Sequence, residues 1–217
     1  DDHWPKVIIN CAAWTDMDGA ERNQKRVWAV NGDGVRNLVS GCIAVRARLI
    51  QVSSDCCEYP LGEYALSKRE GENHAWNLNG HTILRTSWLL SNHPNGWLAH
   101  VRRVASAGPP LYVSSQIGYP TTVDTVVKAI LQLVREPVNG TFCVADYPAI
   151  SKYALACAAL DAARIFRDPS SPQIIEADPG DTSRAPRRVD SRMRGPWYGK
   201  RQDWREWLKA AAPRIVG

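Results

Sequence analysis

Three short apolar runs, separated by longer segments of helical character, constrain the fold of this chain more than any other feature. Residues 6–13, 47–53 and 81–86 are rich in Val, Ile, Leu and Thr, and residues 19–45 and 64–77 lie between them. Short apolar runs of this kind are typical of buried strands in a parallel sheet. Because strands that alternate with helices form βαβ units, the pattern predicts an α/β fold with helices on both faces of the sheet.

The second half of the chain continues this alternation less regularly. We expect strands at 111–113 and 140–145, and helices at 97–107, 122–135, 151–165 and 202–211. Ser151 suits the N-cap of one of these helices. Gly32 and Gly34 weaken the helix expected over 19–45 and allow a break there. Residues 167–196, rich in Pro, Asp, Ser and Arg, are expected to form a loop.

Composition excludes several classes of function. With 44% hydrophobic and 23% charged residues, the 217-residue chain has the composition of a soluble globular protein. Its formal charge is +5, and the basic residues cluster mostly in the last third of the chain: Arg184, Arg187, Arg188, Arg192, Arg194, Lys200 and Arg201. Such a cluster is most often a solvated surface, so we expect no nucleic-acid partner. No apolar run approaches the roughly 20 residues that span a bilayer, and the first residues carry no signal pattern, so no membrane partner is expected.

The six cysteines form no CxxC pair, and four of them lie in apolar runs. A thiol in such a run behaves as a small hydrophobic group. This usage predicts reduced thiols, a cytoplasmic location and no metal site.

Small and polar residues follow each of the first three predicted strands. In open parallel sheets a ligand binds beside the carboxyl ends of the strands. The segments Asn10–Ala13, Val52–Asp55 and Arg85–Trp88 are therefore expected to line one crevice.

Tyr64 and Lys68 stand four residues apart at the start of a predicted helix, so they share one face of it. A nearby ammonium favours the phenolate and lowers the pKa of a tyrosine, which would make Tyr64 a better proton donor to a carbonyl oxygen. A hydroxyl at a neighbouring strand end would hold that carbonyl, and either Ser53 or Ser54 fits. The spacing alone equally fits a helix that carries Tyr and Lys with no catalytic role.

Several segments, taken in order, resemble the dTDP-4-dehydrorhamnose reductase family of extended short-chain dehydrogenase/reductases. The similar segments are VIINCAAWTDMDGAE, AVNGDGVRNL, LIQVSSD, YALSKREGE, ILRTSWLL, SSQIGYPTTVDTVVKAI, GTFCVAD and SKYALACAAL. They cover residues 6–165. The resemblance implies a partial Rossmann-like parallel sheet flanked by helices, with a small C-terminal substrate-binding region. It places the remaining half of the NAD(P)-binding domain at 1–110 and mainly the substrate-binding region, intertwined with it, at 111–217.

The resemblance also implies a role for individual residues. Ser54, Tyr64 and Lys68 would be catalytic, with Tyr64 as the proton donor to a 4-keto nucleotide sugar. NADPH or NADH would contact Ala12, Ala13, Thr15, Asn31, Ser53, Tyr64 and Lys68. The nucleotide-sugar substrate would contact Asp55, Trp88 and Gln116.

Three departures from the family pattern qualify this reading. The chain contains no GxxGxxG turn of the kind that binds a cofactor pyrophosphate, so we expect the N-terminal Gly-rich half to be missing and cofactor binding to be weak. Tyr64 follows Asp55 after only nine residues, which shortens a substrate loop, and residues 184–191 match the family's Arg-Pro-x-Asn-Ser segment only in part. A homodimer or a complex would then cover the exposed sheet edge.

Three alternatives for function therefore stay open. The chain is a fragment or a diverged relative of an active reductase, a noncatalytic family member that acts as a binding or regulatory subunit (as relatives do beside methionine adenosyltransferase), or a degenerate sequence without activity.

Overall fold

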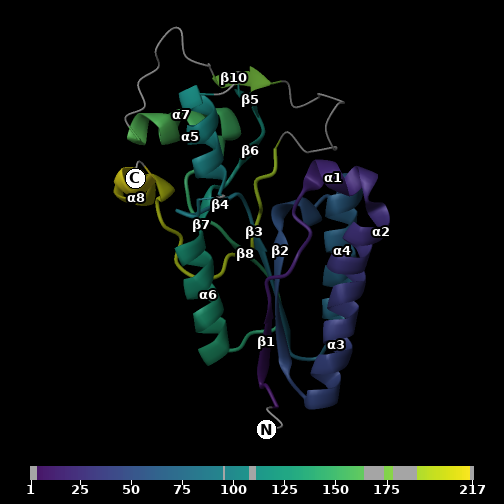
Figure 1. Ribbon diagram of the computed structural model, residues 1–217. Helices are drawn as coiled ribbons and strands as arrows, with labels where there is room; N and C mark the ends of the chain where they lie inside the picture. The colour runs from purple at the N-terminus through teal and green to yellow at the C-terminus, as the bar shows by residue number, and fades with distance from the viewer. Residues whose placement is uncertain (1–3, 95, 108–110, 164–173, 178–189, 216–217) are drawn as a thin grey trace.

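The computed structural model describes residues 4–94, 96–107, 111–163, 174–177 and 190–215, and its centre is a four-stranded parallel sheet (Figure 1). The strand order is β1-β2-β3-β8. The strands are β1 (Val7–Asn10), β2 (Arg48–Ser54), β3 (His81–Thr86) and β8 (Gly140–Val144). The α/β fold class predicted from the alternation of strands and helices is confirmed.

Helices cover both faces of this sheet, and the alternation of side chains along the strands decides which face each residue joins. Leu49 and Ile83 pack with residues of α3 (Gly34–Val45) and α4 (Gly62–Trp76). Ile50 and Leu84 point the other way and pack against α6 (Val123–Arg135). Both sets are fully buried, so each face of the central strands has its own apolar core.

The segment expected as one helix over 19–45 is divided more finely. It contains α1 (Met17–Arg22), α2 (Gln24–Trp28), a π-helical turn η1 (Ala29–Asp33) and α3. Asn23, with φ of −129°, ends α1. The break that Gly32 and Gly34 allowed is not seen, because the chain stays helical there and widens into the π turn.

Gly71 lies where α4 packs closely against η1. A Cβ added to Gly71 of α4 would lie 2.2 Å from the Asn31 carbonyl oxygen of η1. The absence of a side chain therefore lets α4 approach η1 backbone to backbone.

A second group of elements lies above the carboxyl ends of the strands (Figure 1). It comprises α5 (Trp97–Ala107), α7 (Lys152–Ala162) and α8 (Trp204–Ile215), the parallel pair β5 (Leu111–Ser114) and β10 (Ile174–Ala177), and the short pairs β4 (Leu89–Leu90) with β7 (Thr121–Thr122) and β6 (Ile117–Gly118) with β9 (Ile150–Ser151). Ser151 caps α7 as predicted, since its hydroxyl accepts a hydrogen bond from the Ala154 N–H.

The predicted loop over 167–196 is wrong in one part, because β10 lies inside it. A four-residue strand whose partner is about sixty residues away leaves little periodic signal in the sequence. Residues 167–173 and 178–189 of that segment lie outside the described residues, and with them most of the partial match at 184–191. None of the helices described is long and apolar enough to cross a membrane.

One side of the sheet is less completely covered than the other. Ile9 of β1 lies on the same face as Val7, which packs against the α6 cluster, yet it is 44% exposed. Residues Tyr198 and Gly199 contact one flank of α6, on the β8 side. The opposite flank carries four apolar side chains that remain exposed: Val123, Val127, Leu131 and Val134.

Candidate active site

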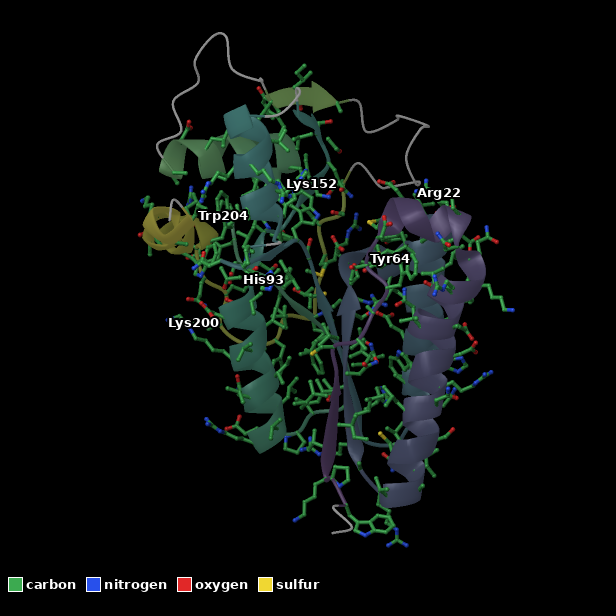
Figure 2. The ribbon with its side chains drawn as sticks, viewed as in Figure 1. Arg22, Tyr64, His93, Lys152, Lys200 and Trp204 are labelled. Atoms are coloured by element: carbon green, nitrogen blue, oxygen red, sulfur yellow. The ribbon has the colours of Figure 1, made fainter. Side chains whose placement is uncertain are left out.

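A cavity of about 370 Å³ lies at the carboxyl ends of the strands. Residues from all three predicted strand-end segments line it, including Cys11, Ala13, Val52, Ser54, Asp55, Thr86 and Trp88. The prediction that these ends share one crevice is confirmed. Figure 2 shows the residues that reach the cavity from either side, Tyr64 from α4 and Lys152 from α7.

Lys68 is held against the end of β2. Its ammonium donates to the Val52 carbonyl oxygen at 3.0 Å, and the Gln51 side-chain amide donates to the same oxygen at 2.9 Å. Burial lowers the pKa of Lys68, while the negative charges that Cys57, Cys56 and Glu72 can carry act in the opposite direction.

Tyr64 lines the same cavity one helical turn before Lys68. Burial raises the pKa of Tyr64 above its usual range, and charge on Cys56 and Cys57 adds to the effect. On balance the pKa of Tyr64 is therefore raised, whereas the spacing of Tyr64 and Lys68 predicted a lowered one. Burial is the largest cause of this rise, and the Lys68 ammonium is itself buried and hydrogen-bonded to a carbonyl.

The hydroxyls of Ser53 and Ser54 have different hydrogen-bond partners, because neighbouring residues of a strand face opposite sides of the sheet. The Ser53 hydroxyl donates to Glu72 Oε1 at 2.6 Å and lies 3.4 Å from Cys57 Sγ. The Ser54 hydroxyl donates to Asp55 Oδ1 at 2.9 Å. Both serines line the cavity, but the Ser53 hydroxyl is committed to Glu72, whereas Ser54 is bonded to Asp55.

A buried ion pair beneath the cavity was missed by sequence reasoning. Arg85 donates to both Glu72 oxygens, through Nε at 2.9 Å and through Nη2 at 2.7 Å, and Glu72 is 1% exposed. One signal was present: Tyr64, Lys68 and Glu72 are four residues apart and share one helix face. The pair fixes α4 to β3 directly under the predicted catalytic side chains.

The loop after β1 is fastened to α4 through Asn31. Asn31 Oδ1 accepts from the Trp14 N–H at 2.9 Å, and Nδ2 donates to Ser67 Oγ at 3.1 Å. Of the residues predicted to contact a cofactor in this loop, Ala13 and Thr15 line the cavity. Asn31 and the exposed Ala12 do not, so Asn31 supports the site from behind.

All three residues predicted to bind substrate, Asp55, Trp88 and Gln116, line the cavity. Trp88 has φ of +21°, rare for a large side chain and common near functional sites. A Cβ on Gly118 would lie 2.7 Å from the Trp88 ring, so glycine is what allows the ring its place. Lys152, which sequence reasoning missed, holds its ammonium 4.9 Å from the centre of that ring.

Two buried polar atoms of the cavity have no hydrogen-bond partner among the described residues: Thr86 Oγ1 and Gln116 Oε1. Buried polar groups are nearly always paired in folded proteins. A polar ligand or an ordered water in the cavity would satisfy both atoms.

The parallel sheet is Rossmann-like, and Tyr64 and Lys68 of α4 line the cavity at its strand ends. This arrangement is typical of short-chain dehydrogenase/reductases. The sequence model described as RmlD substrate binding domain matches residues 1–215. The chain therefore belongs to the RmlD substrate-binding domain family, and the resemblance to reductases of this family seen in its sequence is confirmed.

Known relatives agree with this assignment. A dTDP-4-dehydrorhamnose reductase of Sinorhizobium fredii is 31% identical over 153 residues, which cover 63% of this chain and 52% of the relative. The chain thus spans about half the length of the curated relatives that it matches.

Solved structures extend the likeness to nearly the whole chain. The reductase ortholog from Clostridium acetobutylicum superposes with a TM-score of 0.87 at 25% identity, covering 98% of this chain and 82% of the other. A Bacillus anthracis dTDP-4-dehydrorhamnose reductase in complex with NADP gives a TM-score of 0.82 at 24% identity, covering 95% and 80%. The latter likeness establishes the fold alone.

Proposed function

We propose that this chain carries the catalytic part of an NAD(P)H-dependent reductase that acts on a 4-keto nucleotide sugar, as in dTDP-L-rhamnose biosynthesis. The observation that carries the proposal is the cavity in which Ser54, Tyr64 and Lys68 meet at the strand ends. The names of the relatives, dTDP-4-dehydrorhamnose reductases, support the choice of substrate.

The chain's own residues supply the proton side of this reaction. The Tyr64 hydroxyl would give its proton to the keto oxygen, and its raised pKa keeps that proton in place at neutral pH until the oxygen gains negative charge. Lys68 would bind the ribose of the cofactor, and the phenolate left by Tyr64 would regain its proton from water. When bound, a reduced nicotinamide supplies the hydride.

The residues at the site fit a nicotinamide cofactor. Ala13 and Thr15 are small and leave the backbone of the β1 loop open to the cavity, and Thr86 offers an unpaired hydroxyl. Cys11, which is exposed, lies beside them. The NADP complex of the Bacillus anthracis reductase, which shares this fold, supports the same assignment.

A substrate-dependence assay tests the proposed reaction. The chain is mixed with NADPH, or with NADH, and oxidation is followed with and without dTDP-4-dehydro-L-rhamnose. We expect oxidation that requires the keto sugar. A stable protein that gives no oxidation with either cofactor would favour a binding or regulatory subunit instead.

We also propose that this chain alone binds NADPH weakly, because its sequence offers no glycine-rich turn for the pyrophosphate. Titration of NADPH against the chain, followed by cofactor fluorescence, measures the affinity. Binding in the micromolar range would contradict the proposal. The same titration with NADH tests which cofactor is preferred.

An exposed apolar surface favours a covering partner, which we propose to be a second copy or another chain in a complex. The surface consists of Ile9 on the edge strand β1 and the exposed flank of α6. Unpaired strand edges and contiguous apolar patches are common association sites. We expect Leu131→Glu to shift the protein toward the monomer in light scattering, while Ile43→Glu, on the outside of α3, leaves the mass unchanged. Identical masses for all three proteins would contradict the proposal.

A further inference from the structure

Asp55 lies between two strand ends and holds a hydroxyl on each of its carboxylate oxygens. Ser54 of β2 donates to Oδ1 at 2.9 Å, and Ser87, which follows β3, donates to Oδ2 at 2.8 Å. Ser87 is itself buried, so the carboxylate is built into the wall of the cavity.

The hydrogen bonds of the Ser54 hydroxyl can be counted, because a serine oxygen has one proton and two lone pairs. The proton goes to Asp55. One lone pair accepts from the Cys56 N–H at 3.4 Å, where Ser54 caps the short helix η2 (Asp55–Cys57). The remaining lone pair is left for a donor in the cavity, which Tyr64 and Cys56 also line.

We propose that Asp55 is a positioning residue that takes the only proton of Ser54 and thereby makes Ser54 an acceptor for Tyr64. In this arrangement Ser54 holds the proton donor in place and does not donate to the keto oxygen. Tyr64 is then the hydroxyl with a proton to deliver, and its proton turns from Ser54 to the substrate. The inference deepens the proposed function and rests on it for the catalytic consequence alone.

A cation also supports the ionised form of Asp55. The Lys152 ammonium attracts the carboxylate from α7. Burial acts against this attraction and raises the pKa of Asp55, and the titratable groups that also face it are Cys56 and Tyr64. Protonation of Asp55 would release the Ser54 proton, so the arrangement holds only above the pKa of Asp55.

The sign of one pKa change tests the direction of the hydrogen bond without any turnover. The protein is labelled with ¹³C at the aspartate carboxyl carbon, the Asp55 signal is identified by its loss in Asp55→Asn, and its titration is followed by NMR. If Ser54 donates to the carboxylate, Ser54→Ala raises the pKa of Asp55, by about one pH unit for the loss of one donor. If Ser54 accepts from Asp55 instead, the same substitution lowers that pKa.

Two further variants complete the experiment. Ser53→Ala removes the adjacent hydroxyl, which serves Glu72, and leaves the Asp55 titration unchanged. Ser54→Thr keeps a hydroxyl and restores the titration of the original protein. An unchanged or lowered pKa in Ser54→Ala overturns the proposal, as does an equal rise in Ser53→Ala.

A catalytic readout separates this inference from the proposed function. We expect keto-sugar reduction to fall as the pH is lowered through the titration of Asp55, and this dependence to disappear in Asp55→Asn. A protein with no turnover but with the predicted NMR shifts would retain the hydrogen-bond arrangement and lose the reductase assignment. Turnover whose pH dependence survives in Asp55→Asn would overturn the positioning role and leave the reductase assignment intact.

Discussion

The two faces of the sheet differ in how fully they are closed. On the α4 face, Glu72, Arg85 and Ser53 form a buried hydrogen-bonded group, and Gly71 brings α4 into backbone contact with η1. On the α6 face near β1, by contrast, Ile9 and one flank of α6 remain exposed. The predicted catalytic side chains Tyr64 and Lys68 therefore lie on the closed side, where packing within this chain fixes their positions.

The largest effect is expected from removal of the buried carboxylate. Glu72→Ala leaves the mostly buried Arg85 guanidinium without its partner, and breaking such a pair costs about 3–5 kcal/mol. Urea denaturation measures the loss. Glu70→Ala, in the half-exposed pair with His74, serves as the control and should cost less than about 1 kcal/mol. Equal losses in the two variants would mean that the closed face is not specially dependent on Glu72.

Gly71→Ala tests the contact between α4 and η1. The new Cβ would lie 2.2 Å from a backbone oxygen that cannot move alone, so we expect a loss of about 1–3 kcal/mol in the free energy of unfolding. Gly41→Ala, on the open side of α3, meets no atom within 4 Å and should stabilise the helix by about 0.5–1 kcal/mol. A stabilised Gly71→Ala would show that the two helices are farther apart in solution.

Alkaline pH should reveal the burial of Tyr64. Its pKa is raised on folding, so above about pH 10 the unfolded chain loses this proton first and the free energy of unfolding falls as the pH rises. The pKa of Lys68 is lowered on folding, so its contribution to the free energy of unfolding rises with pH and becomes constant above its ordinary titration range. Tyr64→Phe should therefore lose stability less steeply above pH 10 than the original protein. Parallel curves would indicate a solvated phenol.

The smallest effect is expected on the exposed flank of α6. Leu131→Gln should change the free energy of unfolding by no more than about 0.5 kcal/mol. Leu133→Gln buries a polar amide in the core beneath the same helix and should cost several times as much. The two variants are compared at a protein concentration at which the protein is monomeric. If they lose the same stability there, the flank of α6 is covered within this chain, and the comparison between the faces fails.

Much of the fold was predictable because local patterns carried it. Runs of β-branched residues and the apolar spacing of residues 122–135 located the main strands and α6 without tertiary information. The strand β10 was not predictable, since only its pairing with β5 makes four residues a strand. The π turn at η1, which lies close to Gly71 of α4, likewise has no local pattern that marks it.

The candidate site divides in the same way. Because the carboxyl ends of parallel strands lie at the same edge of a sheet, the sequence predicted that Ser54, Tyr64 and Lys68 share one cavity. The pKa of Tyr64 could not be predicted from the spacing, since desolvation depends on how the whole pocket closes. Lys152 reaches the cavity from α7, about ninety residues along the chain from Tyr64, and nothing in its local sequence marks it.

The rate of keto-sugar reduction by Tyr64→Phe tests the central claim most directly. Tyr147→Phe, which removes a hydroxyl from a half-exposed tyrosine outside the cavity, is the matched control. We expect Tyr64→Phe to lower kcat by about 10²-fold or more, since a positioned proton donor contributes on that scale, while Tyr147→Phe keeps the original rate. An unchanged rate in Tyr64→Phe would contradict the assignment of Tyr64 as the proton donor.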